Sequence, residues 1–306
     1  MSATVQRPES SPPPLPLAIG GPVLVASDGS AVSHEALFTA ARLAVTAYGG
    51  AIEVIGVCEP IPGVVAGMDV LPVSPELDDA RRASMLDDVQ RSVNISAAGD
   101  PLWPISILVG SPPRTLATEA ARRGASLVVM GIGRHNPLDR LFGTETTLAT
   151  LRESSVPILA VGSNFPAAPS HAVVGLDFSP ASIQAAHLAL RLLAHGARLT
   201  LVHVRPRFEH PSTDWQAWDA EYGRTLPPLF EQVSGQLDIP DGVTVDSVTV
   251  RGDPAPALLA YAQQAGADLI AVGTQRHAFI ERLMVGSVAT RVLRMARVGV
   301  LAVPGK

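Results

Sequence analysis

Cysteine and lysine are almost missing from this chain, and each shortage excludes a kind of chemistry. The single cysteine, Cys58, cannot form an intrachain disulfide, and no cluster of cysteine and histidine has the spacing of a zinc site. Cys58 follows the apolar run AIEVIGV, so we interpret it as a buried thiol. The only lysine is the last residue, Lys306. A phosphate loop of the G-x-x-x-x-G-K-[ST] type is therefore excluded, and a Schiff-base lysine is disfavoured.

Charge is also scarce. Only 17% of the residues are charged and 47% are hydrophobic, which favours a globular protein over a disordered one. The net charge of -5 provides no basic face of the kind that duplex nucleic acid requires, so we expect no nucleic-acid partner. A length of 306 residues is enough for two ordinary domains.

The N-terminal segment carries proline where a signal peptide would have its apolar core, and no apolar run approaches the length of a membrane span. We therefore expect a flexible Pro-rich tail over residues 1–20 with polyproline II character. We also expect no membrane partner and a cytoplasmic location.

The rest of the chain contains two similar copies of one sequence pattern. The segment VLVASDGSAVSHEALFTAARLA at Val23 is matched by AVVGLDFSPASIQAAHLALRLL at Ala172, and MGIGRHNPLDRLFGTE at Met130 is matched by VGTQRHAFIERLMVGS at Val272. The matched motifs come in the same order at similar offsets, which indicates tandem domains. We predict one domain over residues 21–164 and a second over 170–306, joined by the link GSNFPAAPSH.

Each copy alternates apolar runs with segments of helical spacing. The runs are PVLVAS, AIEVIGV, ISILVG, SLVVMGI and PILAVG in the first copy, and HAVVGLD, RLTLVHV, VDSVTVRG, DLIAVGT and VGVLAVP in the second. Continuous apolar strands between helices are typical of a parallel sheet that is covered on both faces. We therefore predict an α/β fold with two tandem domains, each a five-stranded parallel sheet with helices on both faces.

Polar or glycine-containing motifs follow several of these strands, where ligands bind in open parallel sheets. Asp28 and Asp177 each follow the first strand of a copy, where a carboxylate could accept from a ribose hydroxyl or help to cap the next helix. Main-chain groups at the end of the second strand could pair with a base edge. The Gly-Thr and Gly-Ser pairs would place free amides and a hydroxyl beside a phosphate.

These motifs, repeated in order, resemble the universal stress protein family, whose fold is Rossmann-like or flavodoxin-like. The resemblance covers the chain from about Pro22. The family's nucleotide-binding pattern is Gly, two residues, Gly, nine residues, then Gly followed by Ser or Thr. In the second copy Gly273, Gly286 and Ser287 match it, with Arg276 in place of the middle glycine.

In the first copy Gly131, Gly143 and Thr144 match the pattern with one residue fewer in the long gap, and Arg134 takes the middle position. By the resemblance, Asp28 and Asp177 would face the ribose of a bound adenine nucleotide, while Val57 and Val204 would face the adenine. The resemblance implies a binding set for ATP or a related nucleotide, which comprises Asp28, Val57, Gly131, Arg134, Gly143, Thr144, Asp177, Val204, Gly273, Arg276, Gly286, Ser287 and Val288.

Both copies replace the middle glycine with arginine and follow it with histidine. The guanidinium of Arg134 or Arg276 could supply an anion contact in place of a close backbone amide. Alternatively, the arginine plugs the pocket or pairs with a neighbouring carboxylate such as Asp139 or Glu281. The sequence leaves both interpretations open.

No catalytic constellation is evident. There is no G-x-S-x-G elbow, no metal-binding motif and no paired carboxylates shared by the two copies, and we interpret His203 as a strand-end histidine. We therefore expect a stress-response regulator that binds ATP without strong catalysis. The alternatives are an interaction module that binds no nucleotide and a slow ATPase or phosphotransferase.

The resemblance also concerns assembly. In single-domain members of the family the last strands pair across a dimer, so PILAV and VGVLAV would pair within this chain as an intrachain pseudo-dimer. Such pairing would cover two strand edges that otherwise need protection. A homodimer of the whole chain is a further possibility, and the sequence does not identify a protein partner.

Overall fold

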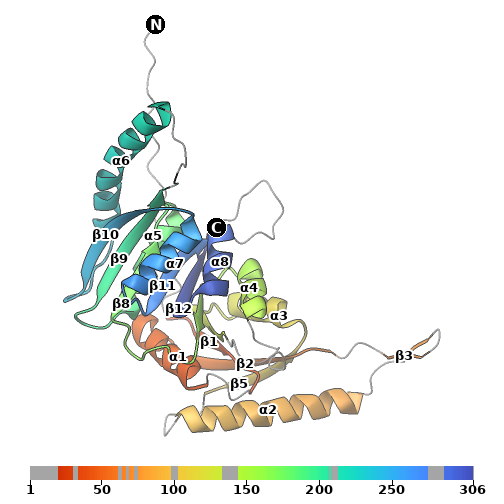
Figure 1. Cartoon of the computed structure of the whole chain (residues 1–306). Helices are drawn as coiled ribbons and strands as arrows, with labels where there is room; N and C mark the ends of the chain where they lie inside the picture. The colour runs from red at the N-terminus through yellow and green to blue at the C-terminus, as the bar shows by residue number, and fades with distance from the viewer. Residues whose placement is uncertain are drawn as a thin grey trace.

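The two copies share one ten-stranded sheet, whose strand order is β10-β9-β8-β11-β12-β7-β6-β1-β2-β5 (Figure 1). The computed structural model describes residues 20–29, 34–60, 64–66, 69–71, 75–97, 103–132, 144–205, 207, 213–274 and 286–305. The strands of the first half are β1 (Val23–Ala26), β2 (Ile52–Cys58), β5 (Ile105–Val109), β6 (Leu127–Gly131) and β7 (Ile158–Val161). Those of the second half are β8 (His171–Gly175), β9 (Arg198–Arg205), β10 (Thr244–Arg251), β11 (Leu269–Thr274) and β12 (Gly299–Pro304).

Within each half all neighbouring strands are parallel, and the order of the first half mirrors that of the second. The prediction of two five-stranded parallel units is therefore confirmed. The chain leaves β1 outward through β2 and β5, then returns to the other side of β1 with β6 and β7. The strand order thus reverses between β1 and β6, and likewise between β8 and β11.

The halves meet along β7 and β12, which pair antiparallel with Leu159 opposite Leu301. This is the pairing of PILAV with VGVLAV that the family resemblance implies. It joins the two parallel units into one mixed, mostly parallel sheet. Because each strand covers the edge of the other, neither unit exposes its last strand.

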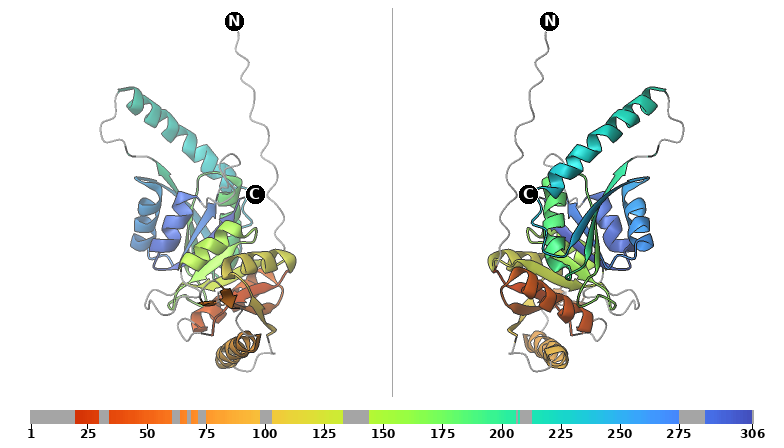
Figure 2. Two further views of the ribbon diagram at one scale, coloured as in Figure 1. Left: turned by 90° about the vertical axis from the view of Figure 1, so that its right-hand side faces the viewer. Right: turned by 90° about the vertical axis from the view of Figure 1, so that its left-hand side faces the viewer.

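Helices cover both faces of the sheet (Figures 1 and 2). On one face lie α1 (His34–Tyr48), α2 (Pro75–Ala97), α5 (Pro180–Leu192) and α6 (Thr213–Ser234). On the other lie α3 (Pro112–Arg122), α4 (Thr144–Glu153), α7 (Pro254–Gln264) and α8 (Ser287–Met295). A separate two-stranded hairpin, β3 (Val64–Ala66) with β4 (Asp69–Leu71), was not predicted from the sequence.

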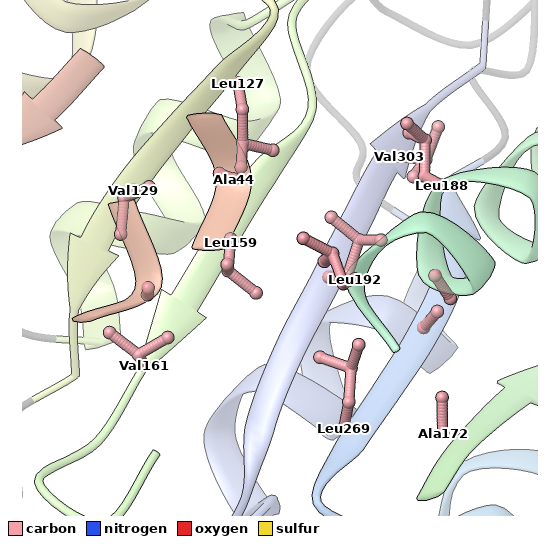
Figure 3. Close-up of a cluster of buried hydrophobic side chains, with 14 of the residues drawn as sticks. Ala44, Leu127, Val129, Leu159, Val161, Ala172, Leu188, Leu192, Leu269 and Val303 are labelled. Atoms are coloured by element: carbon pink, nitrogen blue, oxygen red, sulfur yellow. The ribbon is translucent and has the colours of Figure 1, made fainter. Parts of the chain in front are cut away.

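The layered arrangement explains why the strands read as unbroken apolar runs. Val23 and Val25 of β1 pack into the core under α1 and α5, while Leu24 and Ala26 pack into the core on the other face. Figure 3 shows the first of these cores, where strand residues of both halves, such as Leu159, share one cluster with the two helices. Each fully buried Val or Leu contributes about 1.5–3 kcal/mol to folding, which favours apolar residues on both faces of the central strands.

Two polar contacts reinforce the junction between the halves. The hydroxyl of Tyr48 on α1 donates to the carbonyl oxygen of Leu188 on α5 over 2.8 Å, and burial raises the pKa of that phenol. On the other face, the guanidinium of Arg294 on α8 donates twice to the carboxylate of Glu145 on α4, at 3.0 and 3.2 Å. The second pair is exposed, so we assign the larger stabilising role to the buried one.

Candidate functional site

The candidate site lies at the carboxyl ends of the strands, where the strand order reverses. Asp28 follows β1 and Gly131 ends the neighbouring β6, so the fold brings these residues of the first half to one point. In the second half, Asp177 follows β8 and Gly273 lies near the end of the neighbouring β11. The sequence-predicted residues from distant segments therefore converge in each half.

Asp177 takes part in a local turn. One oxygen of its carboxylate accepts from the main-chain N–H of Ser179 at 3.0 Å and from the hydroxyl of Ser179. The hydroxyl oxygen of Ser179 in turn accepts from the N–H of Ser182 and caps α5. Asp177 therefore supports the cap of α5 by holding Ser179, which is the capping alternative raised by the sequence. Asp28 is half-buried in the equivalent place of the first half. Ser30, the counterpart of Ser179, lies outside the described residues.

Val57 on β2 and Val204 on β9 occupy equivalent places in the two halves. Each lies just beyond the level at which the neighbouring strand, β1 or β8, ends. The pairing of β1 with β2 reaches Ile55, which accepts from the N–H of Ser27, and Val57 lies two residues further on. In the same way, the N–H of Leu176 donates to Val202, two residues before Val204. Successive residues in a strand point their main-chain groups to alternate sides, so the groups of Val57 and Val204 face the space beyond β1 and β8.

The second half presents the N-terminus of α8 at this end of the sheet. Gly286 is the N-cap residue, Ser287 and Val288 begin the helix, and the first turn contains no acidic residue. The first amides of a helix have no partner within it and carry partial positive charge, so they favour an anion. In the first half, α4 begins with Thr144, but its first turn carries Glu145.

The glycines of the motif differ in what surrounds them. A Cβ on Gly273 would lie 2.5 Å from the nitrogen of Ser182 and 2.6 Å from the carbonyl carbon of Ala181, so this glycine lets the first turn of α5 lie against β11. A Cβ on Gly131 or Gly286 would meet no described atom within 4 Å. Gly273 therefore has a packing role besides any role in binding.

Three of the sequence-predicted residues, Arg134, Gly143 and Arg276, lie outside the described residues. Their proposed contacts with phosphate stay predictions. The other members of the set are placed as stated above.

The sequence did not reveal a cluster of charged and aromatic residues at the ends of β9 and β10. Arg205 is buried and pairs with the carboxylate of Asp219 on α6, which Arg251 also contacts. The hydrogen bond from Arg251, together with the charges of Arg205 and Arg251, lowers the pKa of Asp219. The guanidinium of Arg205 lies 5.5 Å from the ring centre of Tyr222. In the sequence, only the arginine at the end of the apolar run RLTLVHVR could have indicated this cluster.

Strand register shows that this cluster is specific to the second half. Cys58 pairs with Val109 in the first half as Arg205 pairs with Arg251 in the second. Cys58 is buried, as the sequence predicts. The candidate site of the second half is therefore flanked by two guanidinium groups where the first half has an apolar pair.

A cavity of about 310 Å³ lies elsewhere, between the C-terminal ends of α7 and α8. Ala267, Ile270 and Val298 line it near the start of β11 and β12, so it opens at the end of the sheet opposite the candidate site. Within the described ranges, no three His, Cys, Asp or Glu side chains are grouped to hold a metal ion. No described helix is both long and apolar enough to cross a membrane.

A doubly wound sheet with convergent residues at the reversal of strand order, built twice, defines a tandem α/β protein of the Rossmann-like class. The chain belongs to the universal stress protein family, because the model of that family matches residues 21–162 and again 170–304. The chain is 28% identical over 232 residues to universal stress protein Rv2005c of Mycobacterium tuberculosis. The matched segment covers 73% of this chain and 77% of that protein. A universal stress protein of Mycolicibacterium smegmatis is 29% identical over 189 residues, which are 60% of this chain and 63% of that relative. The chain therefore spans less than two thirds of that relative's length.

Solved structures show the same fold at low identity. A putative universal stress protein from Pseudomonas aeruginosa is 17% identical, with a TM-score of 0.62 over 94% of each chain. A universal stress protein from Archaeoglobus fulgidus is also 17% identical, with a TM-score of 0.58 over 94% of this chain and 97% of that chain. A further universal stress protein, 25% identical over 44% of this chain and 97% of its own, with a TM-score of 0.33, was solved in complex with cAMP.

Proposed function

We propose that this chain is a stress-response regulator that binds ATP or a related adenine nucleotide, with the second half as the stronger site and without strong catalysis. The observation that carries the proposal is the N-terminus of α8, with no acidic residue in its first turn, in the part of the family motif that also contains Gly273. Free amides and a helix dipole at this point favour a phosphate group.

Each group of the nucleotide would meet a different element. The amides of Ser287 and Val288 and the hydroxyl of Ser287 would take the phosphates. The carboxylate of Asp177 would accept from the ribose. The main-chain groups of Val204 would pair with the adenine edge. Arg276 would add a charge-assisted contact with the phosphates.

Electrostatics favour the second half over the first. Arg205 and Arg251 flank the second site at positions where the first half has Cys58 and Val109. The first turn of α4 carries Glu145, whereas that of α8 carries no acid. We therefore propose that the equivalent set of the first half binds nucleotide more weakly, with Asp28, Val57, Gly131, Arg134, Gly143 and Thr144 as its residues.

The amide contact is tested by replacing Gly286 with valine. A Cβ there meets no described atom within 4 Å, so the variant should fold, while the branched side chain would block the approach of a phosphate. We expect ATP affinity to fall several-fold or more by calorimetry. Gly162→Val is a matched control, because a Cβ on Gly162 also meets no described atom within 4 Å. Equal loss in both variants, or no loss in Gly286→Val, would contradict the proposal.

The role of Arg276 is tested by two substitutions of opposite expectation. If its guanidinium contacts phosphate, Arg276→Ala should lower ATP affinity about ten- to a hundredfold and spare adenosine. If the arginine plugs the site, Arg276→Gly should bind ATP more tightly than the wild type.

The absence of strong catalysis is tested on the wild type. Mass spectrometry of the bound nucleotide after long incubation should find ATP unchanged, and conversion to ADP would favour the slow ATPase instead.

We further propose residues 21–164 and 170–306 as the two folding units of the chain and a homodimer of the chain as its assembly. Sedimentation equilibrium of the purified protein tests the second point. A single species with the mass of one chain at all concentrations would contradict it.

A further inference from the structure

A hydrogen-bonded bridge in the second half joins the end of β8 to α6 through His203. Nδ1 of His203 lies 2.8 Å from the carbonyl oxygen of Leu176, and Nε2 lies 2.8 Å from the hydroxyl of Tyr222. A carbonyl oxygen only accepts, so Nδ1 must be the donor, and in the neutral ring Nε2 accepts from the phenol of Tyr222. His203, only 8% exposed as a residue, is therefore held by both nitrogens of its ring.

The same histidine supports the residue that follows Asp177. The ring of Phe178 lies 4.9 Å from that of His203 and 5.4 Å from that of Phe230 on α6. Phe178 has a φ of 63°, a conformation that non-glycine residues rarely adopt and that surrounding contacts must hold. Asp177 is therefore fixed from both sides, by the bond to Leu176 and by the packing of Phe178.

The first half has no equivalent of this bridge. Strand register places Gly56 at the position of His203, because Val57 and Val204 occupy equivalent places next to them. Glycine has no side chain to reach α2, and a Cβ on Gly56 would lie 2.6 Å from Cδ1 of Ile107 and 3.2 Å from the carbonyl oxygen of Ser27, so a larger residue there would have to displace Ile107. The bridge is therefore a feature of the second site alone.

On its far side the bridge reaches the surface of α6. Trp218, one helical turn before Tyr222, stacks on it with ring centres 5.2 Å apart and planes 4° apart, and is 45% exposed. Leu226 and Phe230 anchor the C-terminal part of the helix in the core. Figure 2 shows the N-terminal part of α6 reaching out beyond the sheet.

We propose that His203 is a positioning residue of the second nucleotide site, and that with Tyr222 it couples occupancy of that site to α6. This inference rests on the function proposed above. A nucleotide that contacts Asp177 and the main chain of Val204 acts on the immediate neighbours of Leu176 and His203. Nucleotide binding therefore tightens the bridge and protects the segment of α6 around Trp218, and the bridge in turn raises nucleotide affinity, because coupling is reciprocal.

Substitutions separate the two bonds of the bridge. Tyr222→Phe removes only the hydroxyl, and His203→Phe removes both bonds but keeps a ring. His203→Asn keeps an N–H donor at the place of Nδ1 and loses the link to Tyr222. Tyr261→Phe, which removes a hydroxyl from α7 on the opposite face of the sheet, is the matched control.

Two measurements are made on the full chain: ATP affinity by calorimetry, and amide hydrogen exchange of residues 213–226 with and without ATP. We expect ATP to slow exchange in this segment in the wild type and in Tyr261→Phe, and to leave it unchanged in Tyr222→Phe and His203→Asn. ATP affinity should fall about three- to tenfold in Tyr222→Phe and further in His203→Phe, and His203→Asn should recover part of that loss. Unaltered affinity and an unaltered response of α6 in Tyr222→Phe would overturn the proposal.

The bridge can also be tested without ligand, which separates its failure from failure of the proposed function. If the wild type binds no ATP, the proposed function and the coupling to nucleotide both fail. The positioning of Asp177 is then judged by exchange of the amides of residues 176–178 in the free protein. They should exchange faster in Tyr222→Phe than in Tyr261→Phe, and equal rates would overturn the role of His203 as well.

Discussion

The close approach of α5 to β11 at Gly273 leads to a specific prediction about stability. A Cβ at this position would lie 2.5 Å from the nitrogen of Ser182, and both of its nearest neighbours are backbone atoms. Backbone cannot rotate out of the way as a flexible side chain can. Gly273→Ala therefore forces the first turn of α5 away from the sheet, whereas Gly131→Ala in the first half meets no described atom within 4 Å.

The magnitude follows from the displacement. Ordinary van der Waals contact begins at 3.4 Å, so the first turn of α5 would have to move by roughly 0.9 Å. Overpacking of this kind costs about 1–3 kcal/mol of unfolding free energy. Gly131→Ala should instead gain about 0.5–1 kcal/mol, because alanine loses less backbone entropy in a strand. The two variants should thus differ by about 1.5–4 kcal/mol.

Urea denaturation followed by circular dichroism measures the difference, with both variants compared with the wild type under identical conditions. Gly273→Ala should also weaken ATP binding, because the displaced turn carries Ser179 and its bond to Asp177. This mixed effect is why Gly286, and not Gly273, is the clean position for testing the site. Equal stability of the two alanine variants would refute the packing role of Gly273.

Two further predictions concern ionisable groups. Tyr48→Phe should lower stability by about 1 kcal/mol through loss of the buried bond to Leu188, measured by urea denaturation. Burial raises the pKa of Tyr48 above its ordinary 10.0, so the unfolded state loses this proton first; wild-type stability should fall as pH rises above 10, and less steeply in the variant. The hydrogen bond from Arg122 lowers the pKa of Glu119 from 4.5 to about 2, so its contribution to stability is present above pH 4.5 and is lost as pH falls toward 2. In Arg122→Gln the pKa of Glu119 should rise, as followed by NMR titration, and an unchanged value would contradict the assignment.

The sequence was sufficient to predict the sheet and its central junction. The central strands are buried on both faces and read as apolar runs, and the edge strand β10 was still recognised from the alternation of its apolar residues in VDSVTVRG. The pairing of β7 with β12 followed from the family resemblance, and the structure adds that the two strands are antiparallel. The separate hairpin β3–β4 was missed, because its strands are short and no repeat marks them.

The candidate site was only partly accessible to the same reasoning. Residues with a local signature, such as Asp177 after β8 and Gly286 before α8, could be placed at the strand ends. The bridge from His203 to Tyr222 could not, because it depends on which face of α6 meets β9 and joins residues of two different elements. Glycine motifs likewise do not disclose that Gly273 is needed for packing against α5.

Calorimetric titration of the wild type and of Gly286→Val with ATP tests the central claim, nucleotide binding by the second half, most directly. The account predicts saturable binding by the wild type and an affinity lower by several-fold or more in Gly286→Val, with Gly162→Val unchanged and all three proteins folded. Saturable binding of equal strength in all three, or no binding by the wild type, would contradict it.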